Sequence, residues 1–243
     1  MVRPFRLILS LTAALLVSVA PARAVEQVDL LLVLASDVSR SVDFPKFKLQ
    51  REGYAKAITD TRVLKAITSG PNGRIAVSFV EWAGYGQQKV VVDWMVVDGA
   101  GTAAAVAEQF IKMPRSFYDR TSISGAIDFS MAQFARAPFE TARKTIDVSG
   151  DGTNNSGPSV IAARDRALAA GVTINGLVIL TDNPQAWNSE HTNPPGGLES
   201  YFRNNVIGGP GAFVLVAENF DSFGQAIVKK LIAEIAMLAP PGR

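Results

Sequence analysis

The chain has 243 residues, 24 lysine and arginine side chains against 22 aspartate and glutamate side chains, one histidine and no cysteine. These counts exclude disulfides, thiol catalysis, cysteine zinc sites and histidine-rich metal sites. The length allows a single domain to bury a large core without covalent cross-links.

The first 24 residues have the pattern of a secretory signal peptide. Arg3 and Arg6 precede an apolar stretch at 7–20, and small residues flank Arg23 at the expected cleavage positions. The apolar stretch is shorter than the roughly 20 residues of a membrane-spanning helix, so we expect cleavage after Ala24 rather than an uncleaved anchor. The mature protein is then exported, either periplasmic or secreted, with no transmembrane segment. Its 21 basic and 22 acidic side chains indicate no nucleic-acid partner.

Strand and helix patterns alternate along the rest of the chain. Apolar runs predict strands at 28–35, 74–82, 89–97, 145–149, 172–180 and 212–216. Helical spacing of apolar side chains predicts helices at 44–67, 102–112, 122–135, 158–170, 198–206 and 222–238. The second and third strands are close enough in sequence to form a hairpin.

This order of elements predicts an α/β fold, a Rossmann-like three-layer sandwich with a mostly parallel central sheet and one antiparallel edge strand. We expect a single domain at 25–239, after the signal peptide at 1–24 and before a frayed tail at 240–243. Ligands of such sheets bind at the C-terminal ends of the strands. Binding residues are therefore expected in the loops that follow the strands.

Oxygen-bearing side chains gather in three such loops. Asp37, Ser39 and Ser41 follow the first strand, Thr121 precedes a predicted helix, and Asp151 follows the strand at 145–149. Two carboxylates and several hydroxyls make an incomplete octahedral site for Mg²⁺ (or Mn²⁺ or Ca²⁺), with room for one outside ligand. The alternative use of Asp and Ser after a strand is to cap a turn or a helix.

The order of these motifs resembles the metal-ion-dependent adhesion site (MIDAS) of von Willebrand factor A (vWA) domains. It consists of Asp-x-Ser-x-Ser at 37–41 after a strand, a threonine before a helix, and Gly-Asp-Gly at 150–152. In that family a protein partner's acidic residue fills the open metal position. The resemblance implies direct ligation by Ser39 and Ser41, direct or water-mediated ligation by Thr121, and largely water-mediated contributions from Asp37 and Asp151.

A closer resemblance covers nearly the whole predicted mature chain. The chain is similar to DUF1194, a family of exported bacterial proteins with the vWA-type fold, in the segments 50–54, 80–82, 121–125, 146–152, 174–177 and 206–213. This resemblance implies the fold and a metal site but brings no activity. Arg40 lies between the two serines, where vWA domains commonly have glycine; its side chain either crowds an approaching carboxylate or pairs with it.

We therefore expect a non-enzymatic binding module that uses a divalent cation to capture an Asp or Glu of a protein partner. One alternative is a haloacid-dehalogenase-like, Mg²⁺-dependent phosphatase, which shares a strand-end Asp and a later Gly-Asp-Gly. That chemistry needs acids where this chain has Ser39 and Asn155. A second alternative is a structural or assembly protein whose metal only rigidifies the loops. The sequence leaves the partner and the oligomeric state open.

Other polar residues are expected to have structural roles. His191 lies in a Pro-rich loop at 182–197 and is expected at the surface, and Asp147 must face solvent or a partner from within its strand. Glu81 is expected to be held by a buried hydrogen bond. Arg51 either pairs with Glu52 on a helix surface or takes part in a contact that holds the fold together.

Overall fold

The computed structural model describes residues 25–180 and 189–236. The predicted signal peptide, the predicted tail and the first part of the loop at 182–197 lie outside these described residues. Among the helices within them, none combines the length and apolar character needed to cross a membrane.

Six strands form the central sheet in the order β4-β3-β2-β6-β7-β8. All neighbouring strands run parallel except β4, which pairs antiparallel with β3 at one edge. The mostly parallel sheet and its single antiparallel edge strand are therefore confirmed. The strands are β2 (Leu31–Asp37), β3 (Ile75–Trp82), β4 (Gln88–Val97), β6 (Lys144–Gly150), β7 (Thr173–Ile179) and β8 (Val214–Ala217). A small parallel pair of β1 (Glu26–Gln27) and β5 (Phe139–Glu140) was not predicted.

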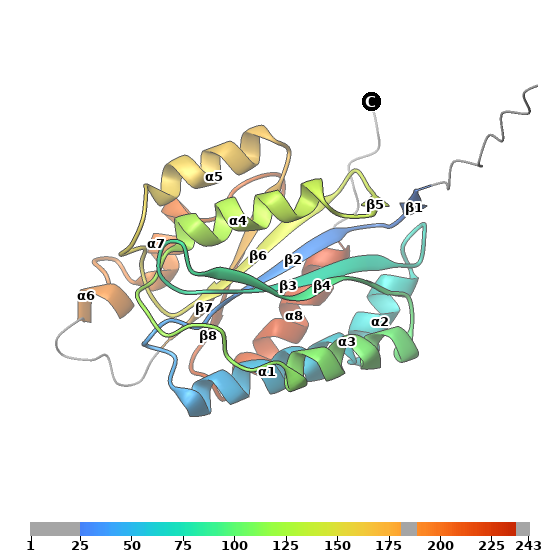
Figure 1. Ribbon diagram of the computed structural model, residues 1–243, viewed down its shortest axis with the longest axis horizontal. Helices are drawn as coiled ribbons and strands as arrows, with labels where there is room; N and C mark the ends of the chain where they lie inside the picture. The colour runs from blue at the N-terminus through green and yellow to red at the C-terminus, as the bar shows by residue number, and fades with distance from the viewer. Residues whose placement is uncertain (1–24, 181–188, 237–243) are drawn as a thin grey trace, which may run out of the picture.

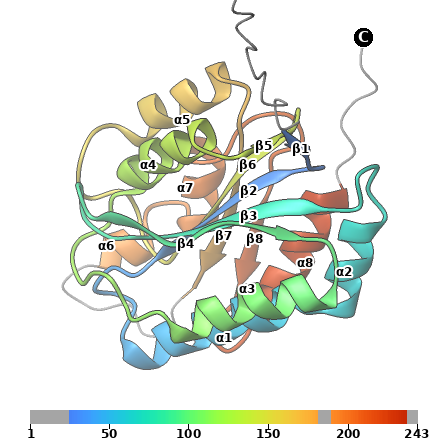
Figure 2. The same ribbon diagram turned by 45° about the vertical axis from the view of Figure 1, so that its right-hand side comes forward.

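Helices cover both faces of the sheet (Figures 1 and 2). One layer contains α1 (Phe44–Ile58), α2 (Thr61–Thr68), α3 (Ala100–Lys112) and α8 (Phe223–Ala236). The other contains α4 (Ile123–Ala135), α5 (Val160–Ala169) and α7 (Leu198–Asn205). A short helix, α6 (Ser189–Thr192), was not predicted.

The predicted helix at 44–67 is wrong as a single element, because the chain forms two helices there. The helix α1 ends at Ile58, and the Asp60 side chain accepts a hydrogen bond from the backbone N–H of Arg62 to begin α2. An aspartate at a helix N-cap competes with the backbone of a continuous helix. The sequence contained this capping signal, but the continuous apolar spacing obscured it.

The central strand β2 is buried along its whole length. Leu32 and Leu34 pack into the core beneath α1 and α8, whereas Leu31, Val33 and Ala35 pack into the core beneath α4 and α5. Burial on both faces explains the unbroken apolar run, as is usual for a central parallel strand. The strand therefore brings its last residue, a carboxylate, to the end of the sheet without exposing it.

Candidate metal centre

The strands β2 and β6 are neighbours, and their C-terminal ends place two of the predicted loops together. Ser36 pairs with Ser149 at the end of this ladder, so Asp37, one residue further along, and Asp151, two residues further along, leave the sheet at the same end. Parallel strands bring such loops to one edge whatever their separation in the chain. The predicted location of the site at this edge follows from that pairing.

Four of the five predicted ligands form one chain of hydrogen bonds. The Ser39 backbone N–H donates to Asp37 Oδ1 at 2.7 Å. The hydroxyls of Ser39 and Ser41 are 3.1 Å apart. Ser41 in turn donates to Asp151 Oδ1 at 2.5 Å. Oxygens from two separated segments thus meet within hydrogen-bonding distance.

Thr121, the fifth predicted ligand, is tied to the same region through its backbone and its hydroxyl. Its backbone N–H donates to Asn155 Oδ1, and its carbonyl accepts from the Asn155 N–H, both at 2.9 Å. Its hydroxyl is hydrogen-bonded to His191 Nε2 at 3.2 Å. Thr121 is therefore held by the loop that follows Asp151, and its hydroxyl contacts the histidine.

Neither of the two aspartates in this cluster has a salt-bridge partner among the described residues. Both are buried, and Oδ2 of each accepts no hydrogen bond among the described residues. Burial first, and then the charge of Asp151, raises the pKa of Asp37 from 3.8 to about 8. Burial also raises the pKa of Asp151, against the opposing effects of Ser41 and Lys46. A bound cation would offset the burial of the two carboxylates and the repulsion between their charges. Hard oxygen donors of this kind suit a divalent ion.

A pH dependence of stability follows for the metal-free protein. Between roughly pH 4 and pH 8 the folded chain keeps a proton on Asp37 that the unfolded chain releases, so the free energy of unfolding falls as pH rises. Denaturant unfolding with chelator present, at about pH 5 and about pH 8, measures this loss. Asp37→Asn, which cannot ionise, should lose less stability over the same interval. Equal losses in the two proteins would mean that Asp37 is not the source.

Two basic side chains hold the loop that carries the serines, and local sequence patterns did not indicate them. Lys46 Nζ donates to the Ser41 carbonyl at 2.9 Å. Arg115 donates from one guanidinium nitrogen to the carbonyls of Val38 and Ser39, at 2.5 and 2.8 Å. These contacts fix the backbone that presents the hydroxyls. Arg115 comes from the distant loop before α4, so only the tertiary fold reveals its role.

The prediction that His191 lies at the surface is wrong. The residue is only 7% exposed, and its ring lies directly over Gly152, where a Cβ atom would approach Nε2 to 2.2 Å. Its Nδ1 atom is 3.1 Å from the Thr153 hydroxyl. Burial lowers the pKa of His191, which favours the neutral imidazole. The glycine after Asp151 therefore leaves room for a ring that orients the Thr121 hydroxyl.

Exposed side chains surround the same edge of the sheet. Phe44 is 70% exposed at the start of α1, and Tyr85 and Tyr118 are each 62% exposed in the loops after β3 and before α4. Arg115 stacks on the Tyr118 ring at 4.9 Å. Arg40 is also exposed, and its guanidinium is 3.9 Å from Asp119. Exposed aromatic and arginine side chains are typical of protein-binding surfaces.

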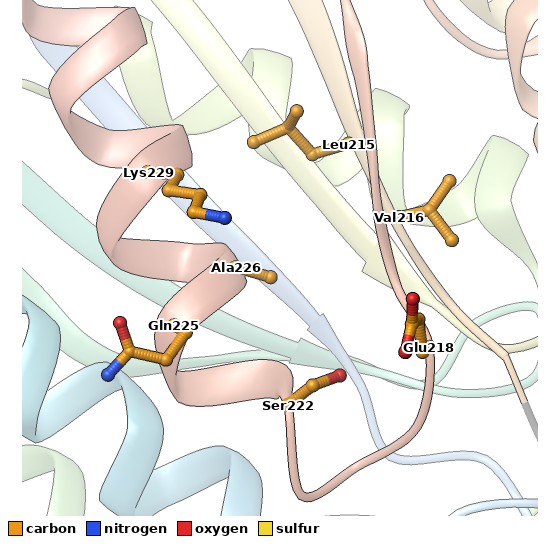
Figure 3. Close-up of a pocket in the computed structure, with 7 residues that line it drawn as sticks. All are labelled: Leu215, Val216, Glu218, Ser222, Gln225, Ala226 and Lys229. Atoms are coloured by element: carbon orange, nitrogen blue, oxygen red, sulfur yellow. The ribbon is translucent and has the colours of Figure 1, made fainter.

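A separate shallow groove lies between β8 and α8 (Figure 3). Its volume is about 240 Å³, and it is lined by Leu215, Val216, Glu218, Ser222, Gln225, Ala226 and Lys229. Sites for small organic ligands are usually about 300–1,000 Å³. The groove shares no residue with the cluster at Asp37, so it does not extend the candidate centre.

The donor set differs from that of common structural metal sites. Within 25–180 and 189–236, no group of three or more His, Cys, Asp or Glu side chains is arranged to hold a metal ion. The candidate centre instead combines two carboxylates with three hydroxyls. Such a set of oxygens fits Mg²⁺, Mn²⁺ or Ca²⁺.

Comparison with solved structures identifies the class of fold. Proximal thread matrix protein 1 of the mussel byssus matches with a TM-score of 0.58 and 15% identity, over 87% of this chain and 47% of that one. The pilus adhesin SpaC of Lactobacillus rhamnosus GG matches with 0.60 and 13%, over 89% and 31%. A vWA protein of Catenulispora acidiphila matches with 0.54 and 16%, over 86% and 43%. The chain thus spans less than half of each of these proteins, and it has the α/β fold of vWA domains.

Within that class, the chain belongs to DUF1194, described as a protein of unknown function, whose family model matches residues 27–239. No curated protein sequence matches the chain. Neither the family model nor the structures named above indicate an enzyme family. The expected relationship to vWA domains and to DUF1194 is confirmed.

Proposed function

We propose that this protein is an exported, non-enzymatic binding module that holds a divalent cation and uses it to capture an acidic side chain of a protein partner. Asp37, Ser39, Ser41, Thr121 and Asp151 would hold the cation. When bound, the cation supplies one coordination position for an oxygen from outside the chain. The observation that carries the proposal is the pair of buried aspartates with unpartnered oxygens, joined through the Ser39 backbone N–H and the two serine hydroxyls.

The surroundings of the cluster favour a protein as the outside ligand. Phe44, Tyr85 and Tyr118 offer apolar area around the cluster, and Arg40 offers a positive charge at its rim. Together these groups suit a peptide segment in which an acid is flanked by apolar side chains. A related fold supports a metal here, because one structure of proximal thread matrix protein 1 is described as having a zinc-occupied MIDAS motif.

Metal-dependent thermal stability tests the cation site. A ligand present at 100 times its dissociation constant stabilises the folded state by about 2.7 kcal/mol, so the wild type should melt at a higher temperature in at least one of Mg²⁺, Mn²⁺, Ca²⁺ and Zn²⁺ than in chelator. Asp37→Ala and Ser41→Ala should lose this response. Asp119→Ala, at the same edge but outside the hydrogen-bonded cluster, should keep it. A wild type that responds to none of the metals would refute the site.

Capture of a partner tests the second half of the proposal. Wild-type protein immobilised with Mg²⁺ should retain a partner from the native cell envelope, and chelator should release it. The Asp37→Ala protein should retain none of it. A partner retained equally by both proteins, with or without chelator, would show binding that does not use the cation.

The exposed aromatic residues should affect the partner without affecting the metal. We expect Tyr118→Ser to weaken partner binding by about tenfold or more, which corresponds to roughly 1.4 kcal/mol, because exposed tyrosines often dominate protein interfaces. Its metal-dependent thermal shift should equal that of the wild type. Val25→Ser removes an exposed apolar side chain directly before β1, a strand that lies at the opposite end of the sheet (Figure 1), and should leave binding unchanged. Dissociation constants of the isolated partner from the wild type, Tyr118→Ser and Val25→Ser measure the effect of each substitution on partner binding.

A further inference from the structure

A second group of buried polar and ionisable side chains lies away from the candidate metal centre, between the middle of the sheet and the helix α8. Asp147 is on β6, Asn175 on β7, and Lys230 and Glu234 on α8. Asp147, Asn175 and Lys230 are 0% exposed, and Glu234 is 1% exposed. Charged side chains are very seldom buried to this extent, so the cluster needs an explanation.

One amine in this cluster faces two carboxyl groups at very short range. Lys230 Nζ is 2.7 Å from Asp147 Oδ1 and donates a hydrogen bond to Glu234 Oε1 at 2.5 Å. Asp147 Oδ1 is paired with Lys230, whereas Asp147 Oδ2 and Glu234 Oε2 have no partner among the described residues. The amine therefore lies in direct contact with a carboxyl group whose second oxygen is unpartnered.

The environment disfavours the ionised form of Asp147. One ammonium cannot compensate two buried carboxylates, and the side chains of this cluster are shielded from solvent. Burial raises the pKa of Asp147 to about 7, with Lys230 acting in the opposite direction and Glu234 adding to the rise. Transfer of one proton from Lys230 to Asp147 gives a free amine beside a neutral carboxylic acid. The Lys230 amine lies over the Phe213 ring, with Nζ 5.5 Å from the ring centroid.

We propose that Lys230 and Asp147 join in an intramolecular isopeptide bond, with Glu234 carrying the proton between them. The Lys230 nitrogen attacks the Asp147 carboxyl carbon, and Glu234 accepts the proton that the nitrogen loses. Glu234 then delivers this proton to the departing hydroxyl group. A carbon–nitrogen bond forms, a carbon–oxygen bond breaks, and one water molecule leaves. No oxidant, reductant or further reactant is needed.

Asp147, rather than Asn175, is the acceptor. The Asn175 amide nitrogen donates to Glu234 Oε1 at 2.9 Å, and its oxygen accepts from the Phe213 backbone N–H at 3.1 Å. Both ends of the amide are therefore occupied by other groups, whereas the Asp147 carboxyl is in contact with the Lys230 amine and its Oδ2 atom is unpartnered among the described residues. The bond would tie a central strand to the last helix in a chain that has no cysteine to do so. It would also remove two buried charges.

The mass of the denatured wild-type protein tests the bond. We expect a mass lower by one water molecule than the mass calculated for the same purified chain. Trypsin should release a branched peptide in which residues 145–164 and 230–243 are joined through Asp147 and Lys230, since an acylated Lys230 resists cleavage. Fragmentation of this peptide assigns the link. A full, unmodified mass would overturn the proposal without any variant being made.

Variants and two other outcomes sharpen the test. Lys230→Met and Glu234→Gln should show the full mass of their sequences, the first for want of the amine and the second for want of the proton carrier. Loss of water confined to a linear 145–164 peptide would indicate a cyclised Asp151-Gly152 and would overturn the assignment. Loss of ammonia together with a branched peptide that joins Lys230 to Asn175 would place the bond at Asn175 and would likewise overturn it. None of these readouts depends on the metal centre.

Discussion

Replacing Arg51 with methionine is expected to lower the free energy of unfolding by about 3–5 kcal/mol, the usual cost of removing one partner from a buried ion pair. Arg51 is 4% exposed and Glu81 is 0% exposed, and the guanidinium donates to Glu81 Oε1 at 2.5 Å. The other carboxylate oxygen accepts from the Ser116 backbone N–H at 2.8 Å. Without the arginine, Glu81 would remain buried with a charge that only one hydrogen bond compensates.

A matched control is available on the same helix. Lys48→Met removes a basic side chain that is 69% exposed and 3.9 Å from Glu52, so we expect a loss of about 0–1 kcal/mol. The double variant Arg51→Met/Glu81→Leu should recover part of the loss, because no unpaired charge remains. Urea unfolding of the four proteins measures these differences. If Arg51→Met were as mild as Lys48→Met, the buried pair would not contribute as argued.

The second large effect is expected from Gly53→Ala at the contact of α1 with α8. A Cβ atom at Gly53 would lie 2.5 Å from Phe223 Cδ1 and 3.3 Å from the Gly224 Cα atom. Phe223 is fully buried and has little room to move. Overpacking of this kind costs about 1–3 kcal/mol, and the better helix propensity of alanine offsets at most about 1 kcal/mol. We expect net destabilisation.

The same substitution at another helical glycine should have the opposite sign. A Cβ atom at Gly101 in α3 would meet nothing within 4 Å, so Gly101→Ala should stabilise by up to about 1 kcal/mol through helix propensity alone. Denaturant unfolding of both variants and the wild type shows whether each substitution raises or lowers the free energy of unfolding. Stabilisation by Gly53→Ala would show that α1 and α8 are less closely packed than the structure has them.

Much of the candidate centre could be predicted because its oxygen donors follow local rules. Asp37 and Asp151 lie at the ends of apolar strands, and Ser39 and Ser41 lie two and four residues after Asp37. Strands that are parallel neighbours bring such loops to one edge. The contacts of Lys46, Arg115 and His191 were not predicted. Lys46 and Arg115 donate to backbone carbonyls, which no side-chain motif identifies, and His191 contacts the Thr121 hydroxyl from 70 residues away in the chain.

The cluster around Lys230 also contains contacts that could not be predicted from local sequence patterns. An acid within a strand must face solvent or a partner, and Asp147 has a partner, a lysine that is far away in the chain and that no local pattern identifies. The helix α8 has the apolar spacing of any amphipathic helix, and a lysine on it would ordinarily be assigned to the solvent side. Only the packing of α8 against the sheet turns that lysine inward.

By itself, the amino-acid sequence determined the alternation of strands and helices, the parallel sheet with its antiparallel edge, and the edge at which the oxygen donors gather. These features depend on hydrophobic periodicity and on strand ends, which are local properties. The tertiary structure alone decided which buried charges meet, namely Arg51 with Glu81 and Lys230 with Asp147 and Glu234. Partners of this kind are chosen by helix packing on the sheet, since no local pattern encodes which distant side chain will compensate a charge removed from water.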